Sequence, residues 1–131
     1  MPLAVDTNVL VRALVNDATE QTERAKERFL AHEIFISTSV LLETEWVLRS
    51  YVKLGRTQIN ELLAIVARSP HVEIEAREQI LSAIHAHQRG LDFADAVHLF
   101  AAQHCEALCT FDADFRHRAR QLKSAISVIA P

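Results

Sequence analysis

The stretch Leu3-Ala4-Val5-Asp6-Thr7-Asn8-Val9-Leu10 decides the fold, because its apolar run stops abruptly at a carboxylate. An unbroken apolar run predicts a strand covered on both faces, and such strands are usually central in α/β sheets. Open α/β folds bind ligands beyond the carboxyl ends of their strands, so Asp6 lies where a functional site is expected. The alternative is that Asp6 only caps a helix that begins near Thr7.

Strands and helices alternate along the rest of the chain. Further strands are expected at residues 34–36, 72–74, 107–111 and 126–129, and helices at residues 9–14, 19–31, 40–53, 57–67, 77–88 and 92–103. A basic turn or helix is expected at residues 115–123. Thr19, one of the residues 37–39, Thr57 and Asp92 are the expected helix caps. Apolar residues cover more than one stripe of segment 40–53, so most of that helix is expected to be buried. Parallel strands require crossover connections, and the alternation predicts an α/β fold with a mainly parallel sheet, in a single domain over residues 1–131.

Length and composition bound the class of protein. The chain has 131 residues, half of them apolar, which is enough for one domain with a substantial core. Its 14 Lys and Arg against 17 Asp and Glu give a net charge of −3, which argues against a protein that coats nucleic acid by bulk positive charge. With no basic leader and no apolar run long enough to span a bilayer, the chain is expected to be soluble, cytoplasmic and independent of membranes.

Several kinds of site are disfavoured by the residues present. Cys105 and Cys109 do not form a CxxC redox motif and are expected to be buried thiols. His104 beside Cys105 does not indicate zinc, because a structural zinc site needs four ligands and no second cluster follows at a matching spacing. The two glycines, Gly55 and Gly90, form no glycine-rich loop that could cradle phosphates.

Four acids stand in apolar surroundings. Asp6 and Asp112 each end an apolar strand, so both can reach the same edge of a parallel sheet. Asp95 is embedded in a helix that is apolar nearly all round. Glu43 precedes Trp46 by three positions and is expected to share its face, whereas Glu45 is expected to look outward.

Burying a carboxylate without a partner costs several kcal/mol, and acids that converge on one point repel one another. A hard divalent cation resolves both problems, because it takes carboxylate oxygens and offsets their charge. The alternative is that each acid pairs with an Arg or Lys from elsewhere in the fold.

Four segments, in order and spacing, carry a resemblance to a known family. They are Asp6-Thr7-Asn8-Val9-Leu10, Glu43 before Trp46-Val47-Leu48-Arg49, Asp92-Phe93-Ala94-Asp95-Ala96-Val97-His98-Leu99 and Thr110-Phe111-Asp112-Ala113-Asp114-Phe115. Together they resemble the PIN-domain ribonucleases and, among these, the VapC toxins, over essentially the whole chain. The resemblance implies a three-layer α/β/α sandwich, usually a homodimer, that cleaves single-stranded regions of RNA with Mg²⁺ or Mn²⁺. It also implies a VapB-type antitoxin as partner.

The resemblance also implies roles for individual residues. The family's four catalytic, metal-binding acids match Asp6, Glu43, Asp95 and Asp112, in that order. Asp114, two residues further on, is the alternative fourth acid. Supporting positions beside the acids are matched by Thr7, Asn8 and Thr110.

The chemistry expected at such a site follows from charge. Attack of water on a phosphodiester needs an activated nucleophile and relief of negative charge, and bound Mg²⁺ supplies both. Hydrolysis that leaves a 5′-phosphate is therefore expected, with transfer, ribosomal and messenger RNA all candidate substrates. Basic residues around the rim are candidates for phosphate contacts, or are ordinary surface charges: Arg12, Arg49, Lys53, Arg56, Arg116, Arg118, Arg120 and Lys123.

Two alternatives belong to other functional classes. One is a phosphatase with Asp6 as nucleophile, but Asn8 stands where a haloacid-dehalogenase-type site needs a second Asp. The other is a catalytically silent PIN-like module that binds RNA or protein. The presence of all four acids argues against a silent module.

Overall fold

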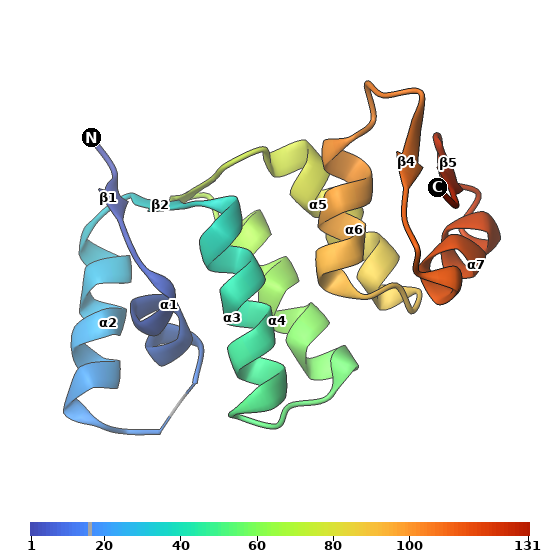
Figure 1. Ribbon diagram of the computed structural model, residues 1–131. Coiled ribbons are helices and arrows are strands. Elements are labelled where there is room, and N and C mark those ends of the chain that lie inside the picture. The colour runs from blue at the N-terminus through green and yellow to red at the C-terminus, as the bar shows by residue number, and fades with distance from the viewer. Residues whose placement is uncertain (16) are drawn as a thin grey trace. The chain divides into compact units, whose positions relative to one another are not determined.

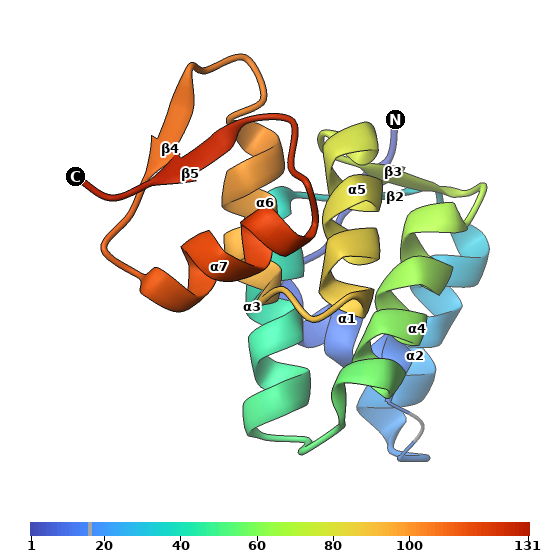
Figure 2. The ribbon, with the colours of Figure 1, turned by 90° about the vertical axis from the view of Figure 1, so that its right-hand side faces the viewer.

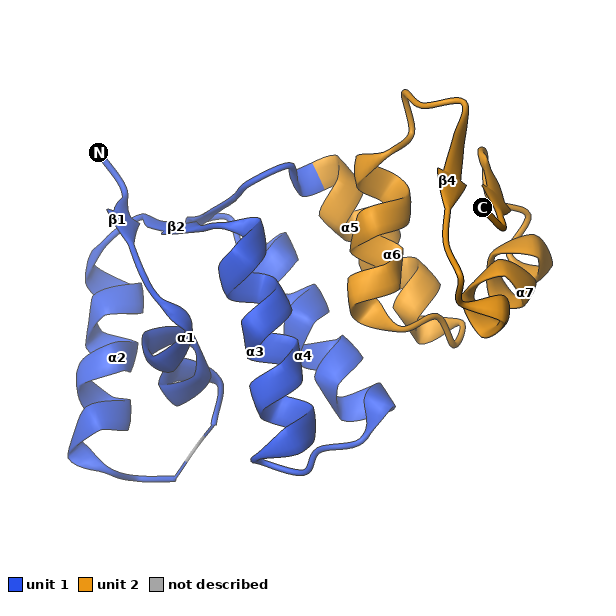
Figure 3. Ribbon diagram, viewed as in Figure 1, with its two compact units in different colours: residues 1–77 blue, residues 78–131 orange. Residues whose placement is uncertain are grey.

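The computed structural model describes residues 1–15 and 17–131, in which helices and short strands alternate (Figure 1). In chain order the elements are β1 (Leu3–Ala4), α1 (Thr7–Leu14), α2 (Glu20–Ala31), β2 (Ile34–Ile36), α3 (Thr38–Ser50), α4 (Arg56–Arg68), β3 (Val72–Ile74), α5 (Arg77–Gln88), α6 (Phe93–Ala101), β4 (Ala107–Cys109), α7 (Ala113–Gln121) and β5 (Ser127–Ile129). They group into two compact units, residues 1–77 and 78–131, called unit 1 and unit 2 below (Figure 3).

Unit 1 is built around a parallel sheet with the strand order β1-β2-β3. Helices α1 and α2 connect β1 to β2, and α3 and α4 connect β2 to β3. Helix α1 packs against both α2 and α3. The core of unit 1 consists of fully buried aliphatic side chains from these elements: Leu10, Ile34, Ile36, Leu41, Leu48, Ile59 and Leu63.

Unit 2 contains a second parallel pair, β4 and β5, which lie side by side in Figure 2. Helix α7 makes the crossover between the two strands and packs against β5. Phe93 is fully buried, with its ring 5.7 Å from that of buried His87 in an edge-to-face contact. Every strand pair in both units is parallel, which confirms the predicted α/β fold class.

The first strand was expected to be central and covered on both faces, and this expectation is wrong for the sheet of unit 1. There β1 occupies the end of the strand order, and Leu3 is 38% exposed. The apolar run is Leu3-Ala4-Val5, and within this sheet it pairs with β2 alone, through Leu3–Ala4. An apolar run of three residues therefore does not distinguish an edge strand from a central one.

Helix α3 is buried along one stripe, not over most of its surface as expected. The buried residues Leu41, Thr44, Glu45 and Leu48 follow the spacing of a single amphipathic face. Trp46 is 46% exposed. The helix also ends earlier than expected, at Ser50.

Local hydrogen bonds move several other boundaries. Gly55, not Thr57, is the N-cap of α4, because its N–H donates to the Gln58 side chain at 3.2 Å. Helix α6 ends at Ala101 and β4 at Cys109, each two residues short of its expected end. Cys105 and Cys109 are exposed free thiols, so their expected burial is wrong: one lies in the connection after α6 and the other at the end of β4.

Among the residues that the structure describes, no helix has the length and apolarity needed to cross a bilayer.

Candidate active site

The carboxyl ends of the three strands of unit 1 present a row of polar residues. The register pairs Ala4 with Phe35 and Ile36 with Ile74, which places Asp6, Ser37 and Glu75 in line just beyond the strands. The row is held by backbone bonds from Val5 N–H to Phe35 C=O, 3.3 Å, and from Glu75 N–H to Ile36 C=O, 3.0 Å. This edge is where an open α/β sheet binds its ligands.

Asp6 is the N-cap of α1, so the helix cap suggested for it from the sequence is present. Its Oδ1 accepts the Val9 N–H at 3.2 Å, and its side chain is exposed. The cap bond fixes the carboxylate at the strand end without burying it, so capping leaves the group accessible to a ligand. Thr7 beside it is buried, whereas Asn8 is exposed.

Glu75 is an acid of this edge that the sequence analysis missed. Its Oε1 accepts the Thr38 N–H at 2.8 Å. This backbone bond, followed by one from the Thr38 hydroxyl, lowers the pKa of the Glu75 carboxyl. A signal was available, because Glu75 directly follows the expected strand at residues 72–74, and Asp6 likewise follows the first strand.

The two acids of α3 have the opposite orientations to those expected. Glu43 is exposed, whereas Glu45 is 4% exposed and pairs with Arg49 at 2.8 and 3.3 Å. Glu45 belongs to the buried stripe of α3, and Arg49, one turn later, supplies the counter-charge. Burial among apolar side chains is therefore not the property that marks Glu43.

In unit 2, Asp95 lies among the other acids of two helix starts. Asp92, the N-cap of α6, accepts the Asp95 N–H at 3.1 Å, which confirms its expected capping role. Asp112, the N-cap of α7, accepts the Phe115 N–H at 3.0 Å. We call Asp92, Asp95, Asp112 and Asp114 the acidic cluster of unit 2.

Negative charge is crowded around Asp95. Burial first, and then the negative charges of Asp92, Asp112 and Asp114, raise the pKa of the half-buried Asp95 carboxyl. Within the cluster, Asp114 also forms an exposed ion pair with Arg118 at 3.0 Å. Repulsion of this kind is what a bound cation would relieve.

Thr110 braces the turn that presents Asp112. Its hydroxyl accepts the Asp112 N–H at 3.1 Å, and its carbonyl accepts a 2.7 Å bond from Arg116. These bonds fit the supporting position expected for Thr110. Arg116 also lines a cavity of about 310 Å³ beside β5, together with Arg120 and Lys123.

The four predicted acids divide between the units, Asp6 and Glu43 in unit 1 and Asp95 and Asp112 in unit 2. Over residues 1–15 and 17–131, no group of three or more His, Cys, Asp or Glu side chains is arranged to hold a metal ion. The chemistry of the donors nevertheless fits a hard divalent cation, because they are all carboxylates and those around Asp95 repel one another. The ligand set stays a prediction.

Comparisons with known proteins place the chain in a family. The model of the PIN domain matches residues 3–121, a range that spans all four acidic motifs. No match was found among curated proteins or among solved structures. Because the match covers most of the sequence and agrees with the parallel α/β fold, the chain belongs to the PIN-domain family.

Proposed function

We propose that this protein is a VapC-like toxin of a toxin–antitoxin pair, a ribonuclease that hydrolyses RNA phosphodiester bonds with Mg²⁺, for which Mn²⁺ can substitute. The observation that carries the proposal is the family match over residues 3–121, because PIN domains are generally metal-dependent nucleases. The raised pKa of Asp95 adds support, since it marks a place where negative charge is crowded.

The proposed site consists of Asp6, Glu43, Asp95 and Asp112. Bound Mg²⁺ would supply an activated water and offset the charge that develops on the phosphate oxygens. Asp6 and Asp112 are each held at a helix start by a backbone N–H, so their carboxylates are oriented before a ligand arrives. Asp112 is the better fourth acid, because the charge of Asp114 is already paired with Arg118.

The proposed partners follow from the same charges. An exposed acidic site is a natural receptor for a bidentate guanidinium. We therefore expect a VapB-type antitoxin to inhibit by placing an Arg against the catalytic acids while it covers the RNA-binding surface. The active toxin is proposed to be a homodimer. An inhibited complex in which Asp6, Glu43 and Asp95 stayed open to solvent would refute this mode of inhibition.

The experiment that tests the function is cleavage of single-stranded RNA by the purified, antitoxin-free protein, with Mg²⁺ and with EDTA. We expect cleavage only with Mg²⁺ and fragments that carry a 5′-phosphate. A silent RNA-binding module would bind the same RNA without cutting it. A phosphatase would release inorganic phosphate from 5′-phosphorylated RNA and leave internal bonds intact.

A further inference from the structure

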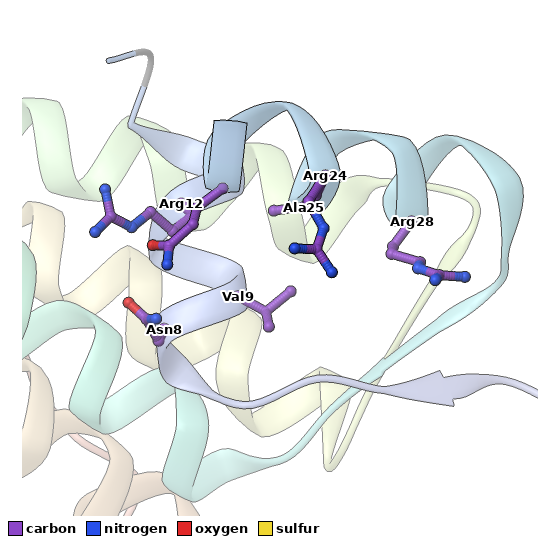
Figure 4. Close-up of a pocket in the computed structure, with 7 residues that line it drawn as sticks. Asn8, Val9, Arg12, Arg24, Ala25 and Arg28 are labelled. Atoms are coloured by element: carbon purple, nitrogen blue, oxygen red, sulfur yellow. The ribbon is translucent and has the colours of Figure 1, made fainter. Parts of the chain in front are cut away.

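Helices α1 and α2 of unit 1 form a groove that none of the four proposed catalytic acids lines. Its cavity of about 280 Å³ is lined by Asn8, Val9 and Arg12 from α1 and by Gln21, Arg24, Ala25 and Arg28 from α2 (Figure 4). We call it the basic groove. Three of its seven lining residues are arginines and none is acidic, although the chain as a whole is negative.

The arrangement of α2 keeps positive charge in the groove. Arg24 and Arg28 lie one helical turn apart, about 6 Å along the axis, and both side chains are exposed. The helix also carries Glu20, Glu23 and Glu27, and none of these lines the groove. The acidic residues of this helix therefore contribute no side chain to the lining of the groove.

The three guanidinium groups differ in the number of ion pairs and hydrogen bonds that they already make. Arg12 is paired with Asp17 at 2.8 Å, which anchors it at the groove wall. Arg28 makes one 3.5 Å contact with His32, and a guanidinium has five N–H donors, so most of its donors are unused by this contact. Arg24 has neither an ion pair nor a side-chain hydrogen bond among the residues described. The groove can therefore donate several charge-assisted hydrogen bonds to an anion.

The basic groove adjoins the strand end that carries Asp6. A second cavity, of about 620 Å³, is lined by Leu3–Asp6, Val9 and Arg28. Val9 and Arg28 line both cavities, so the two adjoin within unit 1. A chain with regularly spaced anions that followed both cavities would run from Arg24 past Arg28 to Asp6.

We propose that the basic groove binds the backbone phosphates of single-stranded RNA through Arg24 and Arg28 and leads the strand to Asp6. This inference rests on the proposed ribonuclease function. Guanidinium groups match phosphate geometry, and contacts with phosphates position a nucleic acid without reading its sequence. The lining also includes the small apolar side chains of Val9 and Ala25, which leave room for the sugar of a single strand.

The test measures binding of a random-sequence, fluorescein-labelled 12-nucleotide RNA by anisotropy in EDTA, where no metal-dependent cleavage occurs. The variant is Arg24→Ala/Arg28→Ala. The control is Arg68→Ala/Arg89→Ala, which removes the same charge from two exposed arginines outside the groove. Loss of two phosphate contacts should weaken binding about tenfold near 0.1 M salt and reduce the slope of log K against log salt by about 1.4. The control should bind like the wild type, and Arg24→Lys/Arg28→Lys should keep most of the salt dependence.

Three results overturn the inference. They are equal binding by the groove variant and the wild type, equal losses in the groove and control variants, and an unchanged salt slope. Tighter binding of a twelve-residue polyglutamate peptide than of RNA, abolished in the groove variant, would assign the groove to an acidic protein segment instead. Wild-type cleavage with Mg²⁺ is measured in parallel. If the wild type cleaves RNA and the groove variant binds and cleaves it equally well, only the groove assignment fails; if the wild type never cleaves, the proposed function fails.

Discussion

The strand ends of unit 1 and of unit 2 share a local motif but differ in their electrostatic surroundings. In both units an aspartate follows a parallel strand and caps the next helix, Asp6 before α1 and Asp112 before α7. Asp6 opens onto a depression that Arg28 also lines, whereas Asp112 contributes to the repulsion that raises the pKa of Asp95. The same cap can therefore lie beside a surface lined by an arginine or beside a cluster of carboxylates.

The largest expected effect separates two acids of the same cluster. Asp95→Asn should lose nearly all metal-dependent RNA cleavage, at least about a hundredfold, because Asn is a poor replacement for an anionic Mg²⁺ ligand. Asp92→Asn should retain most activity, since Asn still caps a helix. Initial cleavage rates of the two variants decide between these roles. Equal losses would place Asp92 in the catalytic set as well, and the reverse order would overturn the assignment.

The two glutamates of α3 should separate activity from stability. Glu45→Gln should lower the free energy of unfolding by about 1–3 kcal/mol, because the buried group loses charge-assisted bonds to Arg49. Glu43→Gln should leave stability unchanged, since Glu43 is exposed, and should reduce cleavage severely. Urea unfolding and cleavage assays on both variants provide the measurement. If Glu45→Gln were stable but inactive, the catalytic role would belong to Glu45 and not to Glu43.

As the pH falls, the contribution of Asp17 in unit 1 to the stability of the fold should decrease, whereas that of Asp95 in unit 2 should increase. Hydrogen bonds from Thr22 and Thr19 help to lower the pKa of Asp17 from 3.8 to about 2, so the stability that Asp17 contributes above pH 3.8 is lost as the pH falls towards 2. The pKa of Asp95 is raised, so its contribution weakens stability as the pH rises above 3.8. Urea unfolding between pH 2 and 5 should show a smaller acid loss in Asp17→Asn than in the wild type. An identical pH profile would contradict the Asp17 contribution.

The smallest expected change in stability concerns the helix cap at Asp6. Asp6→Ala should cost about 1 kcal/mol of stability through the lost bond to the Val9 N–H, whereas Asp6→Asn should keep the cap. Both variants should lose RNA cleavage if Asp6 is a metal ligand. Thermal melting beside the cleavage assay distinguishes the two roles, and wild-type activity in Asp6→Asn would remove Asp6 from the site.

Local patterns predicted most of the fold. The start of α2 after Thr19, the start of α6 after Asp92 and the strand at Ile34–Ile36 were all evident in the sequence, because caps and short apolar runs are local signals. The failures depend on packing. The outward position of Glu43 and the burial of Glu45 were decided by which stripe of α3 is buried by tertiary packing.

The candidate site was predictable to a more limited extent. Its acids were found from strand ends and from the family resemblance, and the cap at Asp92 was found from helix geometry. The place of Glu75 after a strand could have been read from the sequence, but its bond to Thr38 and the basic groove could not, for a physical reason. The role of Glu75 depends on a bond to Thr38, which is 37 positions away in sequence, and the groove depends on α1 packing beside α2. Neither contact leaves a periodic signal in the sequence.

The most direct test of the acidic-site account is the thermal midpoint of the wild type and of Asp95→Asn, with and without Mg²⁺. Without metal, Asp95→Asn should melt at or above the wild-type midpoint, because one of several crowded charges is gone. Mg²⁺ should raise the wild-type midpoint, by the equivalent of about 2.7 kcal/mol at a hundredfold excess over Kd, and should barely move that of Asp95→Asn. A wild-type midpoint that does not change with Mg²⁺, or an equal change of the midpoint in both proteins, would contradict the account.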